Sequence, residues 1–210
     1  MEARFLTLAA KVFAPRTEAR TKVSEDCVPW RFLQAECLQL LAYDGRIICM
    51  TVTPIHPQVR IGHVHLKVAD LVRAQAFYRD VLGFEVTQRY GTGAVFLSAG
   101  GYHHHIGLNT WESAGGKPPP AGTTGLFHLA ILYPTRAALA DALQRLLAAK
   151  IPLDGASDHG VSEALYLRDP DENGVELYWD RPEAEWPRTA DGGLAMHTRE
   201  LDLDALLRAK

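Results

Sequence analysis

The sequence predicts an α+β fold made of two tandem βαβββ modules. Each module opens with a segment in which apolar and polar residues alternate, which is typical of a strand. An apolar stripe at helical spacing follows, and short strand-like segments separated by turn residues come next. Because this order occurs twice, near residues 60–112 and 125–180, we interpret the chain as an internal duplication.

The first module is expected to begin with a strand over residues 61–68. Asp70 is placed to cap the following helix, since its side-chain oxygen can accept hydrogen bonds from the free N–H groups of the first turn. The helix keeps its apolar spacing as far as Leu82, and Gly83 ends it. Three short strands are then expected at residues 84–89, 94–98 and 104–110.

The second module repeats this order after a loop rich in glycine and proline at residues 115–120. A strand is expected over residues 126–132, and Thr135 is placed to cap the next helix. Two strands follow at residues 164–168 and 175–179, on either side of the turn Asp-Pro-Asp-Glu-Asn-Gly.

The chain changes character near the Pro-Ile-His-Pro segment that begins at residue 54. We therefore divide it into an N-terminal extension of unknown role (1–54), the duplicated domain (55–183) and a C-terminal tail with a short helix (184–210). Within the extension, residues 30–41 have the spacing of a short amphipathic helix.

The composition excludes several classes of protein. The chain has 47% hydrophobic and 22% charged residues, which is ordinary for a globular protein. A net charge of −3 gives no broad positive field for nucleic acid or an anionic membrane, and no apolar run approaches the roughly 20 residues that span a bilayer. Cys27, Cys37 and Cys49 lack the close pairing of zinc or redox motifs, and the start lacks a signal-peptide pattern, so we expect a cytoplasmic protein.

A possible metal site comes from the strands that open the modules and from the last strand. The first opening strand carries His63 and His65, the second carries His128, and Glu176 lies in the apolar segment of the final strand. A carboxylate in such surroundings is costly to desolvate unless a cation or hydrogen bonds compensate it. Two imidazoles and one carboxylate can occupy one face of an octahedral ion, as in non-haem Fe(II) oxygenases. The alternative is that the histidines are ordinary strand residues and that Glu176 faces solvent.

Several segments together resemble the vicinal oxygen chelate superfamily, which includes glyoxalase I, bleomycin resistance proteins and extradiol catechol dioxygenases. They are residues 62–71, 77–78, 81–84 and 169–178, within a match over about residues 59–181. The resemblance implies paired modules that form a curved mixed sheet around a divalent metal. It also implies that the ligands are His63 rather than His65, with His128 and Glu176.

Residues 102–111 and 158–166 are most similar to the catechol 2,3-dioxygenase-like subgroup. This similarity implies an acid/base role for His104, with His103 and His105 one step away, and substrate-side roles for Tyr166 and His159. An imidazole with an ordinary pKa of about 6.5 suits removal of a proton from a catechol near neutral pH. The alternatives are an exposed or adventitiously metal-binding histidine cluster, an ordinary strand tyrosine and a loop histidine.

The isomerases of the superfamily add a fourth ligand at the position of Gly107, and glycine has no side chain to bind a metal. We therefore predict a metal-dependent extradiol ring-cleaving dioxygenase, with a small aromatic diol and dioxygen as substrates. Fe(II) is the expected ion, and Mn(II), Ni(II) and Zn(II) are alternatives. The other functions considered are a glyoxalase I-like isomerase or lyase and a metal-free antibiotic-binding protein. Better-known extradiol enzymes have two paired-module domains where this chain has room for one, so we expect a homodimer.

Overall fold

The computed structural model describes residues 38–43, 46–51 and 54–209. Internal contacts divide the chain into two units, residues 1–59 and 60–210. In the first unit, β1 (Leu38–Tyr43) and β2 (Arg46–Thr51) form an antiparallel hairpin. The helix expected over residues 30–41 lies outside the described residues up to residue 37, and it is wrong for residues 38–41, which are strand.

The first module of the second unit forms a four-stranded sheet in the order β3-β6-β5-β4. Strand β3 runs parallel to β6, and the other neighbours are antiparallel. Its elements are β3 (Val64–Lys67), α1 (Leu71–Ala76), the π-helical segment η2 (Phe77–Val81), β4 (Glu85–Tyr90), β5 (Ala94–Ser98) and β6 (Ile106–Asn109).

The second module forms a five-stranded sheet in the order β11-β8-β9-β10-β7, with β7 parallel to β10. Its elements are β7 (Leu129–Leu132), α2 (Arg136–Ala148), β8 (Leu153–Asp158), β9 (Ser162–Arg168) and β10 (Gly174–Asp180). The tail adds η3 (Glu183–Glu185), β11 (Arg199–Glu200) and α3 (Leu203–Leu207). The predicted α+β fold of two βαβββ modules is confirmed, whereas the sequence patterns located neither β8 nor β11.

Side chains cap the first turns of α1 and α2. Asp70 accepts hydrogen bonds from the backbone N–H groups of Val72 and Arg73 at 2.8 and 3.0 Å, and Thr135 accepts one from Ala138 at 3.0 Å. Both predicted caps are therefore confirmed.

Within the described part of the chain, no helix is long and apolar enough to cross a membrane.

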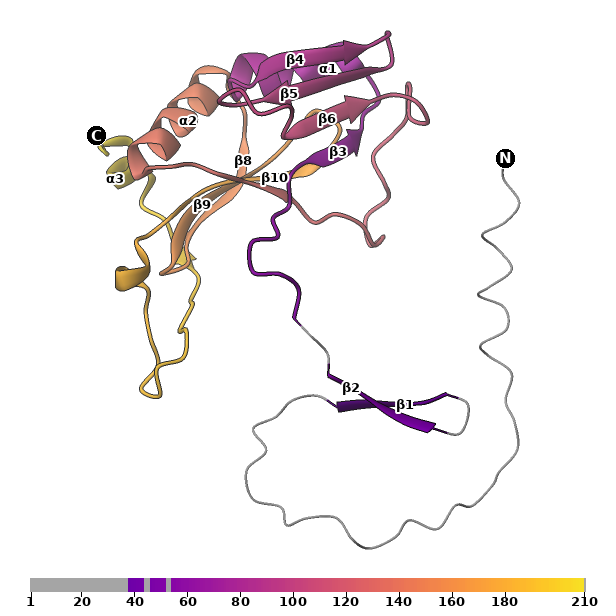
Figure 1. The fold of residues 1–210 in the computed structure, drawn as a ribbon. Coiled ribbons are helices and arrows are strands. Elements are labelled where there is room, and N and C mark those ends of the chain that lie inside the picture. Colours follow the sequence, from indigo (N-terminus) through magenta and orange to yellow (C-terminus); the bar gives the residue numbers. More distant parts are fainter. Residues whose placement is uncertain (1–37, 44–45, 52–53, 210) are drawn as a thin grey trace, which may run out of the picture. The chain divides into compact units, whose positions relative to one another are not determined.

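The apolar faces of the helices and sheets of the second unit form one continuous core. Tyr78 and Leu97 of the first module and Leu143 and Leu177 of the second are 0 to 1% exposed. Burial of each such leucine contributes about 1.5–3 kcal/mol to folding. Figure 1 shows α1 beside the four-stranded sheet, with α2 and α3 beside the strands of the second module. Leu206 of α3 is fully buried, so the tail is part of the fold.

The turn between β9 and β10 ties the two modules together. Asp169 accepts a hydrogen bond from the Tyr78 hydroxyl at 3.0 Å. Asp171 accepts from the backbone N–H of Ala69 at 3.0 Å and pairs with Arg73 at 2.6 Å. Burial raises the pKa of Tyr78 well above its ordinary value, and the charge of Asp169 raises it further. The acidic turn therefore binds α1, the π-helical segment after it and the residue just before its cap.

Candidate active site

Equivalent positions in the two modules can be matched through the pairing of their strands. His63 stands one residue before β3, and His128 stands one residue before β7. In each module the opening strand pairs in parallel with the last strand, in the same register relative to these histidines. Gly107 on β6 and Glu176 on β10 are therefore equivalent, as the count along the sequence indicated.

Glu176 is held between two polar side chains of its own module. Its Oε2 atom lies 2.9 Å from His128 Nε2, and its Oε1 atom accepts a hydrogen bond from the Tyr166 hydroxyl at 2.9 Å. Tyr166 lies directly opposite Glu176 in the β9–β10 pairing. Burial raises the pKa of the Tyr166 phenol, and the hydrogen bond to Glu176 and its charge raise it further. The phenol therefore stays protonated and can act as a hydrogen-bond donor.

His159 extends this series of contacts. It lies in the short turn between β8 and β9, and its Nε2 atom is 2.8 Å from the Tyr166 hydroxyl. The contacts thus run from His128 to Glu176, from Glu176 to Tyr166 and from Tyr166 to His159. These four residues form a continuous polar series.

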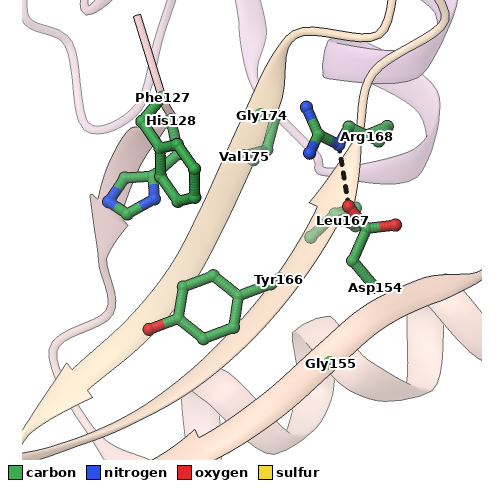
Figure 2. Close-up of a pocket in the computed structure, with 9 residues that line it drawn as sticks. All are labelled: Phe127, His128, Asp154, Gly155, Tyr166, Leu167, Arg168, Gly174 and Val175. Atoms are coloured by element: carbon green, nitrogen blue, oxygen red, sulfur yellow. Dashed lines mark hydrogen bonds and ion pairs between the residues drawn. The ribbon is translucent and has the colours of Figure 1, made fainter. Parts of the chain in front are cut away.

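Two members of this polar series, His128 and Tyr166, line a cavity of about 280 Å³. Figure 2 shows the ring of His128, from the segment just before β7, and the ring of Tyr166, from β9, at the same cavity, with Phe127 next to His128. The side chain of Phe127 is 82% exposed, so its ring is an accessible apolar wall. The ion pair between Arg168 and Asp154, at 2.7 Å, lies at another part of the lining. An apolar wall with a few convergent polar groups is typical of a small-molecule site.

Gly174 allows His128 to approach Glu176. A Cβ atom at Gly174 would lie 2.0 Å from the carbonyl oxygen of Phe127 and 3.1 Å from the Cα atom of His128. Any larger residue would push away the segment that carries His128. Gly174 ends the acidic turn, so the sequence contained a signal for it, although only as a turn residue.

His63, the third predicted ligand, lines a second cavity of about 720 Å³ together with His128. The ring of His63 rests against His104, with ring centres 4.4 Å apart. The structure therefore brings His128 and Glu176 into contact and places His63 and His128 on one cavity. Across residues 54–209, no three His, Cys, Asp or Glu side chains converge closely enough to hold a metal ion. The complete ligand set stays a prediction.

The pair of His128 and Glu176 nevertheless fits a divalent cation. Two ligand atoms that bind one ion at about 2.1 Å and at a right angle lie about 3.0 Å apart, close to the 2.9 Å between these side chains. Glu176 is only 13% exposed, and no Lys or Arg of the described chain forms an ion pair with it. By contrast, the buried Glu163 pairs with Arg136 at 2.7 Å and Arg181 at 2.9 Å. A bound cation would give Glu176 a positively charged partner, as the two arginines do for Glu163.

The three consecutive histidines after Tyr102 have different surroundings. His104 is the one that packs against His63, and its Nδ1 atom is 2.8 Å from His103 Nδ1. His105 is held by Ser98, whose hydroxyl lies 3.0 Å from His105 Nδ1. Burial lowers the pKa of His104, and the neighbouring His63 lowers it further. Among the three, His104 therefore has the position next to a predicted ligand, while its acid/base role stays a prediction.

His65 occupies the space that Gly107 leaves. A Cβ atom at Gly107 would lie 2.9 Å from the His65 ring, which packs edge-on against Phe96 and Trp111 at 5.8 and 5.5 Å. Burial lowers the pKa of His65, and His63 lowers it further. Gly107 is therefore more than the missing ligand that its position in the sequence indicated, because the ring of His65 fills the space beside it.

Two residues of the tail contact the site and were missed from the sequence. His159 Nδ1 lies 3.2 Å from the Thr198 hydroxyl and 3.3 Å from the backbone carbonyl of His197. Neither residue stands in a motif. They reach His159 because β11, which begins at Arg199, pairs with the end of β8.

Comparison with known proteins establishes the family. The model of the Glyoxalase/Bleomycin resistance protein/Dioxygenase superfamily matches residues 60–177, which is more than half of the chain. The chain belongs to this superfamily. The resemblance that the sequence motifs indicated is therefore confirmed.

Curated relatives in the superfamily include ring-diol dioxygenases. The chain is 42% identical over 155 residues to catechol-2,3-dioxygenase of Bacillus subtilis (strain 168), covering 74% of this chain and 53% of that protein. It is 35% identical over 131 residues to biphenyl-2,3-diol 1,2-dioxygenase 3 of Rhodococcus globerulus, covering 62% of this chain and 66% of that protein. The chain thus spans between about half and two thirds of the length of these relatives.

Solved structures show the same fold. A glyoxylase/bleomycin resistance protein/dioxygenase domain from Frankia sp. EAN1pec is 25% identical and has a TM-score of 0.50, over 59% of this chain and 98% of that chain.

Proposed function

We propose that the second unit is an extradiol ring-cleaving dioxygenase that acts on a small catechol-type diol and uses a divalent metal, preferably Fe(II). The observation that carries the proposal is the polar series of His128, Glu176, Tyr166 and His159, two members of which, His128 and Tyr166, line a cavity together with the exposed Phe127. The identity of 42% to a protein named catechol-2,3-dioxygenase supports the same conclusion.

His63, His128 and Glu176 are the residues that would hold the metal. When bound, Fe(II) in a site with two imidazoles and one carboxylate supplies Lewis acidity and open positions for substrate and dioxygen. Among the described residues no Lys or Arg pairs with Glu176, and its nearest nitrogen is that of His128, itself a proposed ligand, which supports a role as a metal ligand.

The remaining residues would orient the substrate and handle its protons. Tyr166 is a protonated phenol, so it can donate a hydrogen bond to an oxygen that becomes negatively charged during the reaction. His104 is the proposed acceptor of the proton of one substrate hydroxyl, and His159 is the proposed partner of Tyr166 on the substrate side. Phe127 would cover the face of the aromatic ring. The homodimer and the cytoplasmic location expected from the sequence remain proposals.

Loading the protein with Fe(II) without oxygen, and then adding catechol under air, tests this function. We expect one equivalent of dioxygen consumed per catechol, measured with an oxygen electrode, and formation of a yellow ring-fission product. The exposed Glu185 is a suitable control position, because Glu185→Gln leaves the site intact and should keep the activity. Iron-loaded protein that consumes no oxygen with any catechol would contradict the proposal. Isomerase turnover with Ni(II), or metal-free binding of an antibiotic, would favour one of the alternative functions.

A further inference from the structure

The C-terminal tail returns to the sheet next to His159. Residues after η3 form a loop closed by a bridge between Arg188 and Leu194, and β11 then pairs with the end of β8. The backbone N–H of His197 donates to the carbonyl of His159 at 3.2 Å. The tail is therefore anchored on both sides of its contact with the His159 ring.

Gly160 makes this approach possible. Its φ angle is +76°, which favours glycine, and a Cβ atom there would lie 2.6 Å from Cε1 of His197 and 2.9 Å from Cγ of Pro187. The turn after His159 is thus shaped to receive the tail, so the contact is built into the fold.

The hydrogen bonds assign the proton on the His159 ring. Tyr166 has one hydroxyl proton, which it donates to Oε1 of Glu176. The Tyr166 oxygen must then accept from His159, so Nε2 of His159 carries a proton. In the neutral ring Nδ1 is an acceptor, and the Thr198 hydroxyl is the donor that can satisfy it.

The backbone carbonyl of His197 can accept a hydrogen bond from the His159 ring when its Nδ1 atom is protonated. It lies 3.3 Å from Nδ1 and can only accept, so it becomes a partner when Nδ1 carries a proton. The Thr198 hydroxyl can rotate to donate or to accept. Nδ1 therefore has a hydrogen-bond partner with or without its proton, and the ring need not turn away from Tyr166.

We propose that Thr198, with the His197 carbonyl, is a positioning residue that keeps the Nε2–H of His159 directed at the Tyr166 oxygen. The proposal rests on the proposed function, because it gives the tail a role in placing a substrate-side histidine. Both residues lie beyond residues 60–177, which the superfamily model matches, so family membership does not assign this role.

The direct test measures the nitrogen chemical shifts of the His159 ring in protein without metal or substrate. Thr198→Val removes the hydroxyl but keeps the shape of the side chain, and Thr198→Ser restores the hydroxyl. Thr123→Val is a matched control, since the Thr123 hydroxyl donates only to a carbonyl of its own exposed loop. Nitrogen chemical shifts from long-range proton–nitrogen spectra, assigned with His159→Gln, should show the Nε2–H tautomer in the native, Thr198→Ser and Thr123→Val proteins. In Thr198→Val a mixture of tautomers is expected. Unchanged His159 shifts in Thr198→Val would overturn the proposal.

A kinetic measurement separates this proposal from the proposed function. Loss of one hydrogen bond to the ring should lower kcat for catechol about fivefold in Thr198→Val with little change in KM, and Thr198→Ser should restore it. An equal kcat in Thr198→Val and the native protein would overturn the positioning role. Absence of turnover in every protein, including the native one, would contradict the proposed function, while the chemical shifts would still decide whether Thr198 positions His159.

Discussion

The two modules share a backbone plan and differ in chemistry at equivalent positions. In the second module Tyr166 lies opposite Glu176, and in the first module Phe96 lies opposite Gly107. A polar donor and a carboxylate in one module thus correspond to an aromatic ring and a glycine in the other. His65 packs over that glycine and fills the space. The two modules therefore share their strand pairing, whereas two of the three proposed ligands, His128 and Glu176, lie in the second module and only His63 lies in the first.

The strongest test of this asymmetry removes its carboxylate. Glu176→Gln keeps the shape of the side chain and an oxygen for the Tyr166 hydrogen bond, but removes the charge that a cation needs. We expect iron affinity to fall by more than about 100-fold, since losing a ligand should cost more than losing the groups that support ligands. Metal content after dialysis, measured by mass spectrometry, checks this, and thermal unfolding of the metal-free protein should change little. Iron occupancy equal to that of the native protein would show that Glu176 is not a ligand.

A smaller effect is expected from the glycine that lets His128 approach. Gly174→Ala places a Cβ atom against the carbonyl of Phe127, so the segment with His128 must move. We expect iron affinity to fall about 10- to 100-fold, comparable to loss of a group that orients a ligand. Isothermal titration with Fe(II) under nitrogen measures this change. Gly125→Ala is the control, because a Cβ atom there has no heavy atom within 4 Å, and it should bind iron normally. Native affinity in Gly174→Ala would refute the positioning role of this glycine.

The smallest effect is expected on the first-module side of the comparison. Gly107→Ala forces a Cβ atom against the His65 ring and should destabilise the domain by about 1–3 kcal/mol. In a His65→Ala background the same substitution should cost much less, because the two residues are in contact. Urea unfolding of the two single variants and the double variant measures this coupling. If the losses of unfolding free energy of the two single variants add up to that of the double variant, contact with His65 is not the reason for a glycine at position 107.

Local signals made parts of this fold predictable. The caps Asp70 and Thr135 depend only on neighbouring N–H groups, and alternation along the chain located most strands. Strand β8 (Leu153–Asp158) was missed because its sequence is largely polar and contains a glycine, so it lacks alternation. The tail strand β11 is only two residues long, and its partner lies far away in the sequence.

In the site, too, contacts within neighbouring strands could be predicted from the sequence, and contacts between distant segments could not. Contact between Tyr166 and Glu176 is a consequence of strand register, which their places on antiparallel neighbours determine. Thr198 could not be predicted, because a threonine in an irregular tail has no pattern that distinguishes it. The relation between His63 and the other two ligands depends on how the modules pack, which no local pattern specifies.

We propose that one divalent ion binds His63, His128 and Glu176 together. Crystals of the Fe(II)-loaded protein, grown without oxygen and measured at the iron absorption edge, locate the ion directly through its anomalous scattering. We expect one strong peak within about 2.0–2.2 Å of Nε2 of both histidines and of a Glu176 carboxylate oxygen. A peak at the His103–His105 run instead, or no ordered iron in the second unit, would contradict it.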